Sequence, residues 1–266
     1  MLLGSVENFS SLMNEKSKEL NLSSTHFVTP HGLDDDNHYA SALDLAILTD
    51  YALNNNLFRK IVNTKTYTIL INKTPKTINN TNELLGYYDG VYGVKTGFTN
   101  GANRCLVTAC NKNNLDVICI VLGCDTKKDR TKDTISLLNY IFENYTIINI
   151  KEIIYNNFNS WLSTHKNSFH INKGQSQILD LAINENDFPF SNLAIRKSDI
   201  NKVSVNIIFD SYFESPLNRN NTIGESTLTI DNKKYFSVRI INNNIIGRKT
   251  YFNYILYFLR NYISFF

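Results

Sequence analysis

Three apolar stretches follow one another between positions 91 and 124 and form the strongest pattern in the chain. The first, Val91–Thr99, is followed by the runs Cys105–Cys110 and Leu115–Cys124, with the polar turn Asn111–Asn114 between the last two. Short apolar runs that are rich in β-branched residues and separated by polar turns are typical of neighbouring strands. We therefore predict three antiparallel strands in this region.

Helical patterns come before these strands. Apolar residues recur at intervals of three and four from Val6 to Leu20, which predicts a helix. Ser41, followed three residues later by the acidic Asp44, predicts the N-terminus of a second helix that runs to about residue 54. Two shorter elements complete this region, a helical turn at 58–62 and an alternating strand at 64–71.

Beyond the third strand the pattern changes twice. The polar segment Asp125–Asp133 predicts a loop, and a helix is expected from Thr134 to about Asn144. Short apolar segments then alternate with Asn, Asp, Gly and Pro as far as about residue 245, which indicates a small all-β module. The predicted fold class is therefore α+β, with helices and an antiparallel sheet in a domain at 1–147 and a β-rich domain at 148–246.

The C-terminal segment 247–266 is amphipathic. At 100° per residue, polar residues gather on one side of a helix, and the other side carries Phe252, Ile255, Leu256, Leu259, Ile263 and Phe266. The apolar stretch is shorter than the roughly 20 residues that span a bilayer, and Arg260 interrupts it. Two interpretations stay open, a helix that lies in a membrane surface and a helix docked on the β-rich domain.

Composition narrows the class of protein. A chain of 266 residues can bury a hydrophobic core in one large or two ordinary domains. The net charge of +3 is too small to indicate a nucleic-acid partner. The first residues do not combine a basic segment with a long apolar core, so no signal peptide is predicted.

The second and third predicted strands contain all four cysteines, Cys105, Cys110, Cys119 and Cys124. A disulfide framework is one interpretation, and small buried residues in a central sheet are the favoured one. Three histidines, His26, His31 and His38, surround the acidic run Asp34–Asp36. That run does not fit the calcium-loop pattern, so a solvated loop is expected, and no metal or cofactor is predicted.

Lys95-Thr96-Gly97 in the first strand is the main candidate for chemistry. Alone, this tripeptide is a weak signal that a turn or a strand start would also explain. A strand places Lys95 and Gly97 on one face, where the lysine supplies a fixed positive charge. A glycine leaves room for another backbone, for instance an extended substrate along the strand edge.

The surrounding residues make the tripeptide specific. The run GVYGVKTGFTNGANRCLVTAC and the following strand that ends in VLGC resemble the low-molecular-weight penicillin-binding proteins of the D-alanyl-D-alanine carboxypeptidase type. The resemblance extends upstream over LMNEKSKELNLSSTHFVTPHGLDDDNHYASALDLA and downstream into the β-rich and amphipathic segments. In such serine acyl-transfer enzymes, K-T-G is combined with S-x-x-K and S-D-N motifs. The resemblance implies a penicillin-binding or β-lactamase-like transpeptidase domain that is partial in this chain.

The resemblance also implies residue roles in the removal of the terminal D-alanine from peptidoglycan stem peptides through an acyl-enzyme. Lys95 would support proton transfer, Thr96 would contact the substrate carboxylate beside Gly97, and the Phe98 N–H would form half of the oxyanion hole. Arg130 matches the arginine that receives the terminal carboxylate through two parallel hydrogen bonds. The family often has an Arg-Asn pair where this chain has Thr81-Asn82.

The nucleophile motifs are expected to be absent from this chain. In the family, S-x-x-K and S-x-N precede the stretch that opens here at Gly4, and Met1–Leu3 would lie inside a helix of the parent fold. Two later matches, Ser163–Lys166 and Ser204–Asn206, follow Lys-Thr-Gly and fall in the β-rich region, so neither is expected to be catalytic. The chain by itself is therefore expected to be inactive.

Two functions remain open, a carboxypeptidase by descent and a non-enzymatic module associated with the cell wall or the membrane. A β-lactamase-like enzyme is disfavoured, because such proteins lack the β-rich and anchor segments. The resemblance implies a peptidoglycan D-Ala-D-Ala stem peptide as partner, β-lactams as ligands of the intact family enzyme only, and a membrane surface as partner of 247–266. Family members act at the extracytoplasmic face of the bacterial membrane, whereas a chain without a signal peptide would stay in the cytoplasm.

Overall fold

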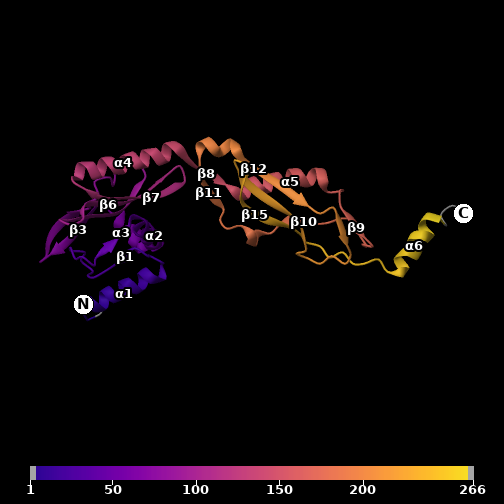
Figure 1. Cartoon of the computed structure of the whole chain (residues 1–266), viewed down its shortest axis with the longest axis horizontal. Coiled ribbons are helices and arrows are strands. Elements are labelled where there is room, and N and C mark those ends of the chain that lie inside the picture. The colour runs from indigo at the N-terminus through magenta and orange to yellow at the C-terminus, as the bar shows by residue number, and fades with distance from the viewer. Residues whose placement is uncertain (1–3, 263–266) are drawn as a thin grey trace. The chain divides into compact units, whose positions relative to one another are not determined.

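The computed structural model describes residues 4–262 and separates into two compact units, Met1–Tyr145 and Thr146–Phe266 (Figure 1). Each unit has its own hydrophobic core. The helical setting expected for Met1–Leu3, and the apolar positions Ile263 and Phe266, lie outside the described residues.

Three helices open the first unit: α1 (Val6–Glu19), α2 (Ala42–Leu53) and α3 (Asn56–Val62). The Ser5 and Ser41 hydroxyls each accept a hydrogen bond from the backbone N–H three residues further on. These bonds satisfy N–H groups that have no partner within the first turn of a helix. The helices predicted over 6–20 and 41–54 are confirmed, and the predicted turn at 58–62 is the second half of α3.

The centre of the first unit is an antiparallel sheet in the order β5 (Val91–Thr99), β6 (Asn103–Lys112) and β7 (Leu115–Cys124). Lys95 pairs with Val107, and Asn113 and Asn114 turn the chain between β6 and β7 with positive φ angles. Asparagine tolerates this left-handed backbone better than most residues. The three predicted strands are confirmed, and β5 lies at an edge of the described sheet.

Helices cover both faces of this sheet. On one face, Leu138 of the helix α4 (Lys127–Asn144) packs with Leu106 and Cys110 of β6. On the other face, Leu53 at the end of α2 packs with Ala109 of β6. Alternate residues of β6 therefore point into two different hydrophobic cores. A shift of the strand by one residue would exchange the two sets, so this burial fixes the register of the sheet.

The helix α4 begins earlier than predicted. The segment 125–133 was expected to be a loop, but α4 starts at Lys127, so Arg130 lies in its first turn. The Thr126 hydroxyl caps the helix, since it accepts a hydrogen bond from the Asp129 N–H at 3.1 Å. Polarity alone suggested a loop, whereas a threonine followed three residues later by an aspartate is a helix start.

Two small antiparallel pairs flank the sheet of the first unit. The strand β3 (Thr66–Ile71) confirms the strand predicted at 64–71, and β4 (Thr74–Asn79), which the sequence pattern missed, pairs with it. The short strands β1 (Thr25–His26) and β2 (Tyr39–Ala40) form the second pair. The histidine-rich loop between β1 and β2 is otherwise irregular, as expected.

The second unit is built on a four-stranded antiparallel sheet. Its strand order is β10 (Leu181–Ile183), β15 (Lys233–Asn242), β14 (Thr222–Ile230) and β12 (Val203–Phe209). The remaining short elements are β8 (Tyr145–Asn149), β9 (His170–Asn172), β11 (Asn192–Arg196), β13 (Tyr212–Glu214), η1 (Glu185–Asp187) and η2 (Lys197–Lys202). The β-rich character predicted for this region is present.

One helix corrects the prediction of an all-β module. The apolar segment at 147–154 was counted among the strands, but α5 (Ile150–His165) occupies most of it. Ile150, Ile154 and Phe158 repeat at four-residue intervals and are buried against Leu228 and Ile240 of the sheet. The sheet has an apolar face that must be covered, and α5 covers it.

The helix α6 (Tyr251–Tyr262) follows the second unit's sheet. Tyr251, Phe252 and Leu259 are exposed, so its apolar side lacks the burial that a docked helix would have. Within residues 4–262, no helix combines the length and the hydropathy that crossing a membrane would require.

Candidate functional site

Lys-Thr-Gly lies in the exposed half of the edge strand β5. Gly93 and Val94 are buried, whereas Lys95, Gly97 and Phe98 are exposed. These residues line a groove of about 520 Å³ in the first unit. The groove contains every residue predicted for the site, Lys95, Thr96, Gly97, Phe98 and Arg130, together with His31, Gly32, Thr81, Thr99, Ala102, Arg104, Cys105 and Lys127.

Lys95 and Gly97 give the groove its cation and its open floor. The Lys95 ammonium donates a hydrogen bond to the Thr96 carbonyl at 2.5 Å, which folds the side chain back along the strand. A Cβ at Gly97 would lie 3.5 Å from the Cys105 Cβ, an ordinary contact. Packing within the chain therefore does not require glycine here, whereas a ligand backbone that approached the strand would.

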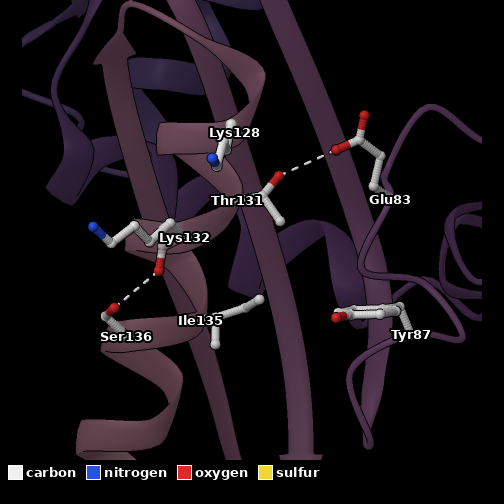
Figure 2. A pocket seen from close by; sticks show the side chains of 7 residues that line it. All are labelled: Glu83, Tyr87, Lys128, Thr131, Lys132, Ile135 and Ser136. Atoms are coloured by element: carbon white, nitrogen blue, oxygen red, sulfur yellow. Dashed lines mark hydrogen bonds between the residues drawn. The ribbon is translucent and has the colours of Figure 1, made fainter.

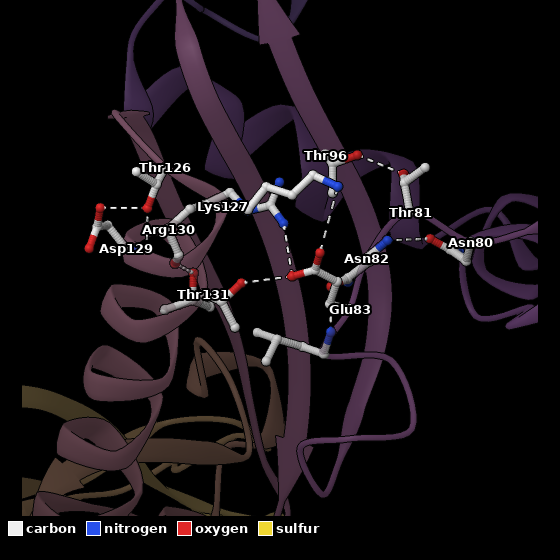
Figure 3. A network of polar contacts seen from close by, with 12 residues as sticks. Asn80, Thr81, Asn82, Glu83, Thr96, Thr126, Lys127, Asp129, Arg130 and Thr131 are labelled. Atoms are coloured by element: carbon white, nitrogen blue, oxygen red, sulfur yellow. Dashed lines mark hydrogen bonds and ion pairs between the residues drawn. The ribbon is translucent and has the colours of Figure 1, made fainter.

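The Thr96 hydroxyl is held by a second hydroxyl. It forms a 2.7 Å hydrogen bond with the Thr81 hydroxyl, and either oxygen can be the donor (Figure 3). Thr81 comes from the segment between β4 and β5, so the bond links two parts of the chain that meet at the groove. The arrangement leaves Thr96 able to donate to a ligand while it accepts from Thr81.

Asn82 fixes the segment that carries Thr81. Its side-chain amide donates to the Gly93 carbonyl at 2.9 Å, and its side-chain oxygen accepts from the Leu84 N–H at 3.1 Å. Asn82 is 3% exposed and Leu84 is fully buried. Buried amides with both ends hydrogen-bonded hold a loop in one conformation.

Arg130 is a buried cation at the back of the groove. Only 3% of its side chain is exposed, and its Nε and Nη2 atoms are buried without a hydrogen-bond partner. The nearest carboxylate belongs to Glu83, 3.6 Å from Nη2, too far for a hydrogen bond. A buried guanidinium with unsatisfied donors is costly unless an anion completes its hydrogen bonds.

The rim of the groove is tied to the β1–β2 loop. The Asp34 carboxylate accepts a hydrogen bond from the Gly101 N–H at 3.1 Å. The Thr99 hydroxyl and then the Gly101 amide hold the pKa of Asp34 below its ordinary value. The Arg104 guanidinium lies 3.5 Å over the Phe98 ring and restrains that side chain.

The sequence interpretation gave no role to Lys127 or Glu83, and it noted Thr81 only as a departure from the family's Arg-Asn pair. Thr81 and Lys127 line the groove, and Glu83 pairs with Arg130 and Lys127. Lys127 precedes Arg130 by three residues, so both lie on one face of a helix, but the helix itself was predicted to start later. Thr81 and Glu83 meet the groove through contacts between distant positions, which no local pattern reveals.

The two serine motifs in the second unit have structural partners. The Ser163 hydroxyl donates to the Ser160 carbonyl in the last turns of α5, a helix rather than the predicted β setting. The Ser204 hydroxyl pairs with the Thr229 hydroxyl across β12 and β14 at 2.7 Å. Within the part of the chain that the structure describes, no cluster of His, Cys, Asp or Glu has the arrangement of a metal site.

All four cysteines are free thiols. Cys110 and Cys119 are buried in the sheet, and burial raises the pKa of each to about 11. A thiol with such a pKa is neutral at physiological pH and behaves as a small apolar side chain. The favoured interpretation, small buried residues, holds for Cys110 and Cys119, whereas Cys105 and Cys124 are half-buried.

Comparisons with known proteins point to one family. The model of the D-alanyl-D-alanine carboxypeptidase family matches residues 1–126. The Bacillus subtilis D-alanyl-D-alanine carboxypeptidase DacF is 32% identical over 229 residues, which cover 86% of this chain and 56% of DacF. The Haemophilus influenzae enzyme DacA is 38% identical over 144 residues, or 53% of this chain and 36% of DacA. The chain thus spans about half the length of such relatives, or less.

Comparisons with solved structures find the same kind of protein. Penicillin-binding protein 5 from Haemophilus influenzae superposes with a TM-score of 0.63 and 28% identity, over 92% of this chain and 67% of that protein. Penicillin-binding protein 6B from Escherichia coli superposes with a TM-score of 0.64 and 23% identity, a likeness of fold alone. Both matches extend over the two units and support the predicted α+β penicillin-binding fold.

Proposed function

Because this chain belongs to the D-alanyl-D-alanine carboxypeptidase family of low-molecular-weight penicillin-binding proteins, we propose that its first unit forms the substrate-binding wall of such an enzyme. The substrate would be a peptidoglycan stem peptide that ends in D-Ala-D-Ala, and the reaction would release the terminal D-alanine. The groove beside β5 would hold the end of that peptide.

The buried guanidinium of Arg130 is the observation that carries this proposal. Arg130 lines the groove together with Lys95 and Thr96, and its Nε and Nη2 donors are buried without a hydrogen-bond partner. A carboxylate accepts two parallel hydrogen bonds from a guanidinium, so a terminal carboxylate suits this site. Like charges from Lys95 and Arg130 around one groove also favour an anionic ligand.

The remaining groups have roles that follow from their positions. The Thr96 hydroxyl would donate to the same carboxylate while it accepts from Thr81. The exposed edge of β5 would pair with the extended peptide backbone, which the small Gly97 leaves room for. The Phe98 N–H would supply one oxyanion donor when a serine attacks the peptide carbonyl and an acyl-enzyme forms. Lys95 would stabilise the negative charge that develops.

A binding experiment tests the role of the groove. N-acetyl-D-alanyl-D-alanine is titrated into the isotope-labelled 266-residue chain, and amide shifts of β5 and α4 are followed by NMR. We expect weak, saturable binding that Lys95→Ala and Arg130→Ala each reduce. Lys166→Ala, a cation of the second unit, is the control. Binding that is unchanged in both groove variants would contradict the proposal.

We propose further that α6 associates with a membrane surface. Ile255 and Leu256 are exposed on its apolar side together with Phe252 and Leu259, Arg260 lies toward its polar side, and Lys249 directly precedes the helix. An interfacial helix combines an apolar face with a polar face and nearby basic residues. The proposed location is the outer face of the bacterial membrane, where the peptidoglycan substrate of the family lies.

A non-enzymatic module of the cell wall or membrane is the second candidate function. The exposed apolar side of α6 favours it, because membrane association does not depend on the groove. In that case the groove variants would leave wall and membrane binding unchanged and D-Ala-D-Ala binding would be absent.

A further inference from the structure

The Glu83 carboxylate lies among three groups at the N-terminus of α4. Its Oε2 accepts a hydrogen bond from the Thr131 hydroxyl at 3.2 Å and is 3.6 Å from the Arg130 guanidinium. Its Oε1 is 3.8 Å from the Lys127 ammonium. Figure 3 shows the side chain pointing from the segment before β5 toward α4. Glu83 is thus the only anion that the described residues place against these two cations of the groove.

The fold, rather than a chance rotamer, places this carboxylate. The neighbouring residues Asn82 and Leu84 are buried, and Asn82 bridges the segment to β5. The backbone of Glu83 is therefore fixed, and its side chain can only project toward α4 or toward solvent. It remains 49% exposed, so it can move without disturbing a core.

Glu83 compensates the charge of Arg130 but does not satisfy its hydrogen-bond donors. At 3.6 Å the contact gives electrostatic attraction, but Arg130 Nε and Nη2 still have no hydrogen-bond partner. An anion that enters the groove can approach these donors more closely and form charge-assisted hydrogen bonds. The same anion would be repelled by Glu83 as long as Glu83 stays in place.

A second cavity gives the displaced carboxylate a place to go. Between α4 and the segment before β5, Glu83 borders a cavity of about 520 Å³ together with Lys128, Thr131 and Lys132 (Figure 2). Glu83 lines this cavity and not the groove, but it contacts Lys127 and Arg130, which line the groove. Lys128 lines the same cavity, so a carboxylate that leaves Arg130 still has a cation beside the space that it enters.

We propose that Glu83 is a displaceable counter-ion of Arg130 that sets the anion affinity of the groove. With the groove empty, Glu83 compensates the charges of Arg130 and Lys127. When a ligand carboxylate binds Arg130, Glu83 moves toward Lys128. Glu83 is therefore a specificity-determining residue that weakens the binding of carboxylates in general, so that only ligands with additional contacts along β5 are retained. This inference rests on the proposed role of Arg130 as the carboxylate site.

The test compares Glu83→Gln with the unmodified 266-residue chain in the NMR titration. Glutamine keeps the shape and still accepts from Thr131, but it does not repel an anion. We expect Glu83→Gln to bind N-acetyl-D-alanyl-D-alanine about threefold to fivefold more tightly, the range for charges in a partly exposed site. Glu143→Gln, with the same charge change at the other end of α4, should leave binding unchanged.

Two further ligands separate the possible outcomes. The affinity for the C-terminal amide of the same dipeptide should not change in Glu83→Gln. The affinity for acetate should increase by the same factor as the affinity for the acid dipeptide. Acetate that binds through Arg130 when the dipeptide does not would contradict the proposed function and leave this inference standing. The inference would be overturned if Glu83→Gln bound carboxylates more weakly than the unmodified chain or equally well, or if neither chain bound them. Glu83 would then only position Arg130 or play no part in binding.

Discussion

The hydroxyl pair of Thr81 and Thr96 shows how single residues determine the chemistry of the groove. If Thr96 donates to a ligand carboxylate, its own oxygen must accept from Thr81, which lies 2.7 Å away. Thr81 would then orient the donor without touching the ligand. Sequence similarity located Thr96, but the pair became visible only because the segment before β5 folds over that strand.

Thr81→Val removes this orientation while it preserves the shape of the side chain. We expect it to weaken binding of N-acetyl-D-alanyl-D-alanine about fivefold, since a typical hydrogen bond contributes about 1 kcal/mol. Binding of the C-terminal amide should change little. Thr77→Val, which breaks a similar hydroxyl pair between β3 and β4 away from the groove, is the control. A Thr81→Val chain that binds the acid as well as the unmodified chain would rule out the orienting role.

At the scale of elements, the start of α4 decides where Arg130 lies. The cap by Thr126 brings the helix forward to Lys127, so Arg130 is buried against the sheet rather than solvated in a loop. The repeated apolar pattern predicted the sheet strands and the earlier helices correctly. It failed for α5, because a short apolar run such as 147–154 fits a buried strand as well as part of a helix. The four-residue spacing becomes clear only when the run is read on to Phe158.

The helix α6 provides the prediction at this scale. The 266-residue chain should sediment with vesicles that contain anionic lipid, and a chain that ends at Gly247 should not. Ile255→Asp places a charge in the middle of the apolar side and should reduce binding at least tenfold, because a buried charge is costly. Asn253→Asp adds the same charge on the polar side and should have a much smaller effect. Equal sedimentation of the truncated chain would show that α6 is not the membrane contact.

At the scale of the whole molecule, the two units have separate cores, and one tryptophan distinguishes them. Trp161 is the single tryptophan of the chain and packs in the aromatic cluster of the second unit with His165 and Phe209. Its fluorescence therefore follows unfolding of the second unit, whereas far-ultraviolet circular dichroism follows both units.

An ion pair makes the second unit sensitive to acid. Asp187 accepts hydrogen bonds from Nε and Nη2 of Arg239, and this pair lowers the pKa of Asp187 to about 2. A carboxyl whose pKa is lower in the folded state stabilises the fold above its unfolded pKa, 3.8 here, and loses that contribution as the pH falls toward 2.

The free energy of unfolding reported by Trp161 should therefore fall between about pH 5 and pH 2. Asp187→Asn should lower it at neutral pH by no more than about 1 kcal/mol, since the pair is partly exposed, and should flatten the acid dependence. Asp210→Asn removes one exposed charge from the same unit and controls for net charge. An unchanged acid dependence in Asp187→Asn would exclude the pair as its source.

Much of the molecule follows from local pattern and family resemblance. The strands β5 to β7, the helices α1 and α2 and the α+β class were predictable, because apolar period and helix caps are local. The gathering of Lys95, Thr96 and Arg130 in one groove was expected from the resemblance. Glu83 and Thr81 were not, because their roles depend on contacts across the fold that neither spacing nor composition encodes.

The central claim is that the groove of the first unit binds the terminal carboxylate of a D-Ala-D-Ala peptide for serine catalysis. The most direct test fuses this chain to the N-terminal portion of a relative that supplies S-x-x-K and S-x-N, and measures D-alanine release. The account predicts turnover by the fusion that Lys95→Ala and Arg130→Ala each lower at least about tenfold, equivalent to about 1.4 kcal/mol. A fusion that turns over at the same rate with both residues replaced would contradict it.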